Sequence, residues 1–400
     1  MLDTFKMMAA VMEERWKKRP RGFDLYTRAT ISSMIRAYDN DIKTVFVSGY
    51  AFPFELLWAF DVARFDLEIA TNNLPQALNG HGSTLMTVAE DLGYSQDICS
   101  FHRLIIGCLA EGMLPTADLT VASSYYCQGK AKAWEIVADR QGGECLMFDV
   151  PNEISPASMR YVTDQLKDIA DRLARLTGQS LDMDRLKNAI RWSNKARKSL
   201  HQLNDLLKLK PCPWDGRLAS LLGLGGALLL GSPVRDEIHN MLINEITARV
   251  EKGSTFPEDY RVLWYPWAPV QQTNMFKTLK ENNVSVVMSE PAFVWWSEMD
   301  EENPFEALAL KALENPQVGT PAKRIANLLA MIDEYDVDGV VHFSTPSCYH
   351  ETATYPLTSE VLKEKGVPVL NIDGDMTDER KYFPEQTLTR ISAFSEVLRG

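Results

Sequence analysis

The sequence lacks an apolar run long enough to cross a membrane, and it lacks a C-x-x-C cysteine pair. Its longest apolar stretch, residues 218–231, is interrupted by glycines and is shorter than the roughly 18 to 20 residues of a membrane span. We therefore interpret this stretch as a buried helix or turn. The first 20 residues have no basic start followed by an apolar core, so no signal peptide is expected and the expected location is cytoplasmic.

An excess of positive charge is also missing. The 42 Lys and Arg residues are outnumbered by 54 Asp and Glu residues, which gives a formal net charge of −12 and no basic stripe. This charge argues against non-specific nucleic-acid binding, and neither nucleic acid nor a membrane is expected as a partner. The 45% of hydrophobic and 24% of charged residues are ordinary for a globular protein, and 400 residues predict two or three domains.

The first part of the chain alternates strand and helix patterns. Strands are predicted at residues 42–50, a β-branched run, and at residues 117–127 and 144–151. A helix is expected at residues 53–63, with Pro53 in its first turn. Strands that alternate with helices predict a parallel sheet, and ligands of such sheets bind beyond the carboxyl ends of the strands. The loops after Ser48 and after Ser124 are expected at that edge.

The middle of the chain changes to a helical pattern, and the end returns to alternation. Apolar residues from Val162 to Leu176 follow helical spacing, and Ser232 with Pro233 predicts another helix start. Four further strands are expected at residues 260–269, 284–292, 337–348 and 367–375. The prediction is an α/β fold with two Rossmann-like parallel-sheet domains, residues 1–151 and 256–400, and a helical domain, residues 152–255, between them.

The six cysteines fall into two groups by position. Cys127 and Cys348 follow directly on predicted strands, and Cys99 stands at the polar start of a helix, where the helix dipole favours a thiolate. The other three occupy structural positions in a helix, a strand and a connection: Cys108, Cys145 and Cys212. Three thiolates gathered from separate loops suit an iron–sulfur cluster, since a zinc ribbon would need C-x-x-C pairs. The alternative is three ordinary loop cysteines.

Several segments together resemble the 2-hydroxyacyl-CoA dehydratase and benzoyl-CoA reductase family. They occur in the family's order and span most of the chain: "FPFELLWAFD" (52–61), "CSFHRLIIG" (99–107), "SSYYCQGKAKAWE" (123–135), "VHFSTPSCYH" (341–350) and residues 366–398. The last segment is the most specific, because it contains P-x-L-x-I-x-x-D-x-x-D-x-R and closes with T-R-I-x-A-F-x-E.

This resemblance implies a function and a set of partners. It implies a 4Fe-4S cluster on Cys99, Cys127 and Cys348, a homologous second subunit, and an acyl-CoA bound between the two subunits. A separate ATP-dependent iron–sulfur activator would inject one electron into the thioester carbonyl. The resulting ketyl radical would expel the hydroxyl and acidify a neighbouring C–H bond, so that a 2-hydroxyacyl-CoA loses water. A benzoyl-CoA-type reductase subunit and a non-catalytic electron-transfer subunit remain as alternatives.

The same segments supply the other candidate site residues. Glu55, in the family's P-x-E element, and Ser48 are the candidate catalytic residues, although an acidic residue is also favoured in a helix's first turn. Tyr50, His102 and Arg103 are the candidate substrate-binding residues; Arg103 could instead bond cluster sulfides, and His102 could be a buried supporting residue. The acidic loop around Asp375, Asp378 and Arg380 lacks calcium-site spacing and is expected to form a structural ion network.

Overall fold

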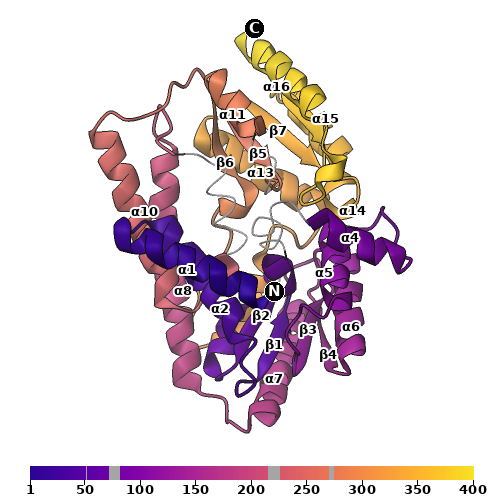
Figure 1. Ribbon diagram of the computed structural model, residues 1–400. Coiled ribbons are helices and arrows are strands. Elements are labelled where there is room, and N and C mark those ends of the chain that lie inside the picture. Colours follow the sequence, from indigo (N-terminus) through magenta and orange to yellow (C-terminus); the bar gives the residue numbers. More distant parts are fainter. Residues whose placement is uncertain (51, 72–81, 215–225, 270–273) are drawn as a thin grey trace.

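Two parallel four-stranded sheets form the centre of the protein. The computed structural model describes residues 1–50, 52–71, 82–214, 226–269 and 274–400 (Figure 1). One sheet has the order β2-β1-β3-β4 and the other the order β6-β5-β7-β8. The strands of the first are β1 (Thr44–Val47), β2 (Ala63–Asp66), β3 (Leu119–Ser123) and β4 (Glu144–Phe148). Those of the second are β5 (Tyr260–Tyr265), β6 (Val284–Ser289), β7 (Gly339–Ser344) and β8 (Val369–Asp373). The predicted α/β fold with two parallel sheets is confirmed.

All seven predicted strands are present, but the predicted helix at residues 53–63 is wrong. A 3-10 helix occupies Phe54–Ala59, the backbone is extended at Phe60, and β2 begins at Ala63 and pairs in parallel with β1. Nearly every side chain of this segment is buried, so it lacks the exposed face of an amphipathic helix. The position of the segment in the core therefore decides its structure. A 3-10 helix stands in place of the predicted helix, and β2 begins at its predicted end.

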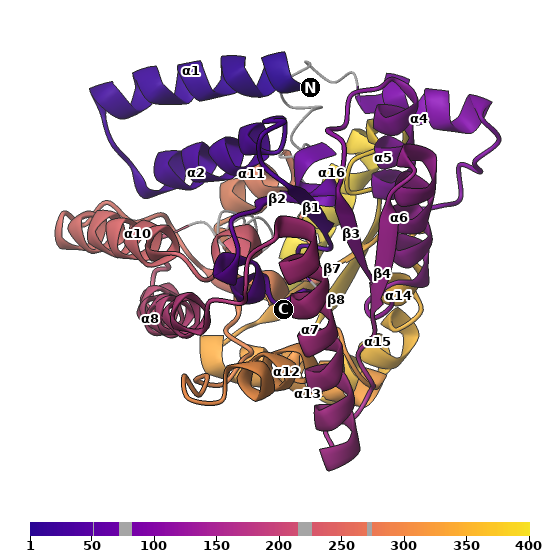
Figure 2. The ribbon, with the colours of Figure 1, turned by 90° about the horizontal axis from the view of Figure 1, so that it is seen from below.

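Helices cover the first sheet on both sides. Helix α6 packs against β3 and β4, α2 packs against β2, and α4 packs against α5 (Figure 2). The helices of this part are α1 (Leu2–Lys18), α2 (Gly22–Arg36), α4 (Gly82–Asp91), α5 (Ser100–Ala110) and α6 (Gln128–Gln141). Strand β1 is buried along its whole length, as expected for a parallel strand covered on two faces.

The second sheet is covered in the same way, with two separate apolar layers. Alternate side chains of β5 enter opposite layers: Trp264 packs with α11 and α16, and Leu263 packs with α13 and α15. The helices of this part are α11 (Asn274–Glu281), α12 (Pro304–Glu314), α13 (Pro321–Tyr335), α14 (Tyr349–Thr352), α15 (Tyr355–Glu364) and α16 (Pro384–Arg399). The remaining 3-10 turns are Ala227–Leu229, Glu290–Ala292 and Glu379–Lys381.

The helical middle section shares its apolar side chains with both sheets. It contains α7 (Pro156–Thr177), α8 (Met183–Leu207) and α10 (Pro233–Glu251), with Ser232 and Pro233 at the predicted start of α10. Leucines of α7 join the core of the first sheet, and leucines of α8 and α10 join a core of the second. The domain boundaries at residues 151 and 255 stay predictions, and most of the apolar stretch 218–231 lies outside the described residues. None of the described helices is long and apolar enough to cross a membrane.

Both sheets change direction at the same place in their strand order. In the first, the chain moves outward from β1 to β2 and then returns to the other side of β1 to form β3; β5, β6 and β7 repeat this path. A crevice forms at the carboxyl ends of the strands on either side of such a switch point. The two crevices supply residues to one shared cavity, which therefore lies between the sheets.

Candidate metal centre

The cavity between the sheets contains the three cysteines selected from the sequence. Cys99 is the N-cap residue of α5, Cys127 is the N-cap residue of α6 after β3, and Cys348 precedes the short α14 after β7. All three line a cavity of about 60 Å³, together with His102, Lys130 and Glu351 among others. The fold thus brings together three thiols that are separated by up to 249 positions in the sequence (348 − 99).

The other three cysteines lie in structural positions. Cys108 is fully buried in the apolar core on α5, and Cys145 lies in β4. The Cys212 thiol donates to the carbonyl of Trp214 at 3.2 Å. None of these three lines the cavity between the sheets. Position relative to predicted strands and helices was therefore sufficient to separate the two groups of cysteines.

The environment of the thiols disfavours unpaired thiolates. Burial raises the pKa of Cys99, and the nearby Cys127, Asp375 and Glu68 raise it further. Burial also raises the pKa of Cys348 well above its usual value, with a further contribution from Glu351. A positively charged group, such as a metal, would be needed to hold such thiols as thiolates.

The donor type of the cavity is that of an iron–sulfur cluster, whose ligands are cysteine thiolates. In the described part of the chain, no three His, Cys, Asp or Glu side chains lie close enough together to hold one ion. A cluster takes thiolates on several irons and so accepts sulfurs that stand farther apart than the ligands of one ion. Three cysteines around a cavity match that requirement, and no fourth cysteine of the described ranges lines it.

A buried ion pair beside the cysteines was not predicted from the sequence. The Lys130 ammonium lies 2.7 Å from a Glu68 carboxylate oxygen and 4.8 Å from the centre of the Tyr126 ring. Burial lowers the pKa of Lys130, but Glu68 and Asp66 outweigh burial and the net shift is upward. Burial and Glu68 raise the pKa of Asp66 to about 7. Asp66 ends β2 and Glu68 lies in the helical residues directly after it, a segment for which the sequence pattern predicted no element.

His102 and Tyr50 both contribute to the cavity at the cysteines. Burial lowers the pKa of His102 to about 4, so its imidazole is neutral near pH 7. The Tyr50 ring packs edge-on against Trp267 at 5.1 Å between ring centres and also lines a smaller neighbouring cavity of about 40 Å³. Trp295 and Trp296 form part of the wall of that second cavity. Tyr50 therefore separates the cysteines from an aromatic cavity.

Glu55 and Ser48 lie apart from the cysteines. Glu55 is fully buried, and one of its carboxylate oxygens accepts from Ser193 at 2.6 Å and from Lys311 at 2.5 Å. The other oxygen has no hydrogen-bond partner among the described residues. Glu55 does not line the cavity at the cysteines, although its partner Lys311 lines the aromatic one. The Ser48 hydroxyl is buried at the end of β1 and also has no partner in the described ranges.

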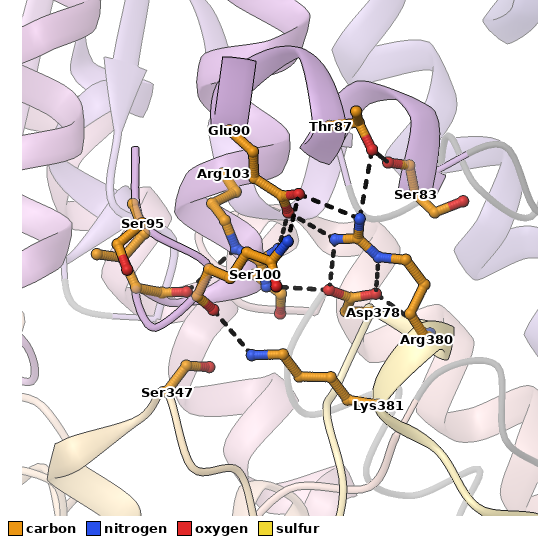
Figure 3. A network of polar contacts seen from close by, with 12 residues as sticks. Ser83, Thr87, Glu90, Ser95, Ser100, Arg103, Ser347, Asp378, Arg380 and Lys381 are labelled. Carbon is orange, nitrogen blue, oxygen red and sulfur yellow. Dashed lines mark hydrogen bonds and ion pairs between the residues drawn. The ribbon is translucent and has the colours of Figure 1, made fainter. Parts of the chain in front are cut away.

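Arg103 is held in the ion network that the acidic loop was predicted to form. Its guanidinium donates to Glu90 at 2.5 Å and to Asp378 at 3.1 Å, and its Nε donates to the Ile98 carbonyl (Figure 3). Arg380 binds the same two carboxylates from the other side. Arg103 is completely buried. These contacts give each nitrogen of the guanidinium one partner within the ion network, and a role of Arg103 in substrate binding stays a prediction.

A second, wider cavity opens on the cysteines. It has a volume of about 880 Å³, and Cys99, Cys127 and His102 contribute to its wall. Polar and aromatic residues from both sheets complete this wall, among them Tyr126, Gln317 and His350, and Tyr349 at its rim is 74% exposed. No lysine or arginine of the described residues lines it. The wider cavity therefore has room for a ligand of considerable size beside Cys99 and Cys127.

Comparison with known sequences identifies the protein family to which this two-sheet fold and its three cysteines belong. The chain belongs to the family described as 2-hydroxyglutaryl-CoA dehydratase, D-component, which matches residues 50–398. It is 25% identical to the alpha subunit of (R)-2-hydroxyglutaryl-CoA dehydratase of Acidaminococcus fermentans over 72% of this chain and 61% of that relative. The aligned part of this chain thus spans less than two thirds of that relative.

Two further relatives match over more of their length. The alpha subunit of lactoyl-CoA dehydratase of Anaerotignum propionicum is 25% identical over 79% of this chain and 82% of its own. One of the subunits of the benzoyl-CoA reductase of Thauera aromatica is 24% identical over 86% of both chains. The resemblance seen in the sequence is confirmed at the level of the family, and it includes both dehydratase and reductase subunits.

Proposed function

We propose that this chain is the iron–sulfur subunit of a 2-hydroxyacyl-CoA dehydratase and that Cys99, Cys127 and Cys348 hold a 4Fe-4S cluster. The observation that carries this proposal is the convergence of these three thiols, from both sheets, on one cavity. A cluster held by three cysteines leaves one iron open to an exogenous ligand and supplies one-electron chemistry. The wide cavity gives an acyl thioester a route to that position.

The reaction needs this chemistry because of the acidity of the substrate. A β-proton of an acyl-CoA is too weakly acidic for an ordinary general base. One-electron reduction of the thioester carbonyl to a ketyl expels the hydroxyl and acidifies the neighbouring C–H bond, and the electron is recovered after water is lost. The electron would come from an ATP-dependent iron–sulfur activator.

The protein's own residues have defined tasks in this proposal. The aromatic wall formed by Tyr50 and Trp295 would exclude water from the acyl group, and neutral His102 would donate or accept a hydrogen bond at the substrate. Glu55 would handle a proton or hold the substrate hydroxyl through its unpartnered carboxylate oxygen, and Ser48 would donate a hydrogen bond. Arg103 would act mainly through the position of α5, since each of its three side-chain nitrogens donates to a partner in the ion network.

A homologous second subunit is part of the proposal. Coenzyme A carries several phosphate charges, and the wide cavity has no lysine or arginine among its described lining residues. A partner surface would then supply the cations. Relatives named as alpha and beta subunits both match this chain, which supports a pair of related subunits.

The test is anaerobic purification of the chain with candidate partner and activator proteins. We expect about four irons per chain on the three cysteines and ATP-dependent loss of water from a 2-hydroxyacyl-CoA. A benzoyl-CoA-type reductase is the second candidate, because the relative with that name matches 86% of both chains. Reduction of an aromatic acyl-CoA without dehydration would favour it. A protein that binds no iron under these conditions would refute both.

A further inference from the structure

Two buried carboxylates of the second sheet contact the residues next to all three cysteines. Asp375 follows β8, and Glu351 lies in α14. Both side chains are almost completely shielded from solvent, with exposed fractions of 0% and 3%. The reaction proposed above assigns neither of them a task.

Asp375 joins the neighbours of Cys99 and Cys348. One of its carboxylate oxygens accepts from the Ser100 hydroxyl at 2.5 Å, and the other accepts from the Ser347 hydroxyl at 3.4 Å. The first oxygen also accepts from the backbone amides of Thr377 and Asp378, each at 3.0 Å, which fixes the carboxylate in its own loop. One rigid group therefore positions the start of α5 relative to the loop after β7.

Glu351 makes the corresponding connection for Cys127. One of its oxygens accepts from the Trp267 indole at 3.0 Å and from the Tyr126 hydroxyl at 3.4 Å. Its other oxygen pairs with Arg324, which is itself held by Glu290 through two hydrogen bonds of 3.0 and 2.7 Å. Glu351 lies three residues after Cys348, so it links the neighbourhoods of Cys127 and Cys348.

The backbone at Tyr126, next to Cys127, has an unfavourable conformation. Tyr126 has a φ of +80°, in the left-handed region that a bulky side chain rarely adopts. Its ring packs against Trp267 and His350, both from the second half of the chain, at 6.2 and 5.0 Å between ring centres. Such a conformation is unfavourable and persists only where the surroundings hold it. The contacts with the second sheet hold it here, directly before Cys127.

We propose that Asp375 and Glu351 are positioning residues, which fix the spacing of the three cysteines across the two sheets before a cluster binds. This inference rests on the proposed function, since it concerns the retention of the cluster. Partners of metal ligands typically contribute about 10- to 100-fold to metal affinity. The carboxylates would act through their contacts with Ser100, Tyr126 and Ser347.

The test compares Asp375→Ala and Glu351→Ala with two matched controls. Asp118→Ala removes a carboxylate that accepts from the Thr44 amide at 2.8 Å, at the opposite end of the first sheet. Glu258→Ala removes a buried partner of Arg261, which keeps three carbonyl acceptors. Each reconstituted protein is mixed anaerobically with a chelator, the release of iron is timed, and the thermal midpoint of the iron-free protein is measured.

We expect iron loss to be about 10- to 100-fold faster in the two test variants and unchanged in the controls, although all four lower the thermal midpoint. Asp375→Asn and Glu351→Gln, which keep one acceptor oxygen, should release iron at intermediate rates, and they replace any alanine variant that fails to fold. Iron loss that follows the thermal midpoint alike in tests and controls overturns the positioning role alone. A wild-type chain that takes up no iron overturns the cluster and this inference together.

Discussion

Replacement of Glu55 by Gln should separate a catalytic role from a structural one. Glu55 is fully shielded from solvent, and the side chain of its partner Lys311 is 6% exposed. Gln keeps the shape of the side chain but removes its charge, so the Lys311 ammonium is left buried without a counter-charge. Breaking a buried ion pair in this way typically costs about 3–5 kcal/mol. Glu55→Gln should therefore lower the free energy of unfolding by about 3 kcal/mol in anaerobic urea titrations.

The double variant Glu55→Gln with Lys311→Met completes the test. A neutral pair of similar volume should recover most of the lost stability, because the buried charge is gone. If Glu55 also acts on a proton of the substrate, turnover should stay down by roughly a hundredfold in the double variant. Recovery of both stability and turnover would leave Glu55 with a structural role only. A Glu55→Gln protein as stable as the wild type would refute the reasoning from the buried pair itself.

Three more predictions concern the centre and its surroundings. Alanine at any of the three cysteines that line the cavity should abolish iron binding, measured as iron per chain, whereas Cys108→Ala should retain it; the reverse result would refute the assignment. Lys130→Met leaves the Glu68 carboxylate without its cation and should cost about 3 kcal/mol of unfolding free energy; an unchanged urea midpoint would contradict this. The pKa of Asp66 is raised from 3.8 to about 7, so the folded state holds a proton that the unfolded state loses. Stability from this group is full below about pH 4 and is lost as the pH rises to about 7. Asp66→Asn should remove that part of the pH dependence of the urea midpoint, and an identical pH profile would refute it.

The sequence was most informative where the local residue pattern and the place of the segment in the core favour the same structure. Six of the seven predicted strands contain β-branched residues, and a strand buried on both faces of a parallel sheet, such as β1, favours them. The remaining strand, β4, was predicted from its apolar residues and its place in the alternation of strands and helices. The cysteines that follow strands could be selected because the carboxyl ends of parallel strands share one edge. The ion network of Asp378 and Arg380 was predictable because opposite charges stood close together in one loop.

The sequence was least informative where distant side chains decide the outcome. Strand β2 was missed because Ala63–Asp66 carries no β-branched residue, and its strand conformation comes from pairing with β1. Lys130 and Glu68 could not be paired in advance, since they lie on different elements and meet only in the fold. Glu55 was expected at the cysteines, but its contacts are with Ser193 and Lys311, which belong to helices 138 and 256 positions away.

The distribution of the three thiols along the chain has a consequence for biogenesis. Cys99 and Cys127 are synthesised with the first sheet, but Cys348 follows β7, the seventh of the eight strands in the described part of the chain. The carboxylate of Asp375, which contacts the neighbours of two cysteines, emerges later still. A nascent or truncated chain that ends before β7 therefore presents two unprotected thiols and an incomplete binding site. Insertion of the cluster proposed above would then be a late event in maturation, after both sheets have folded, and premature release from the ribosome would leave a chain with an incomplete site.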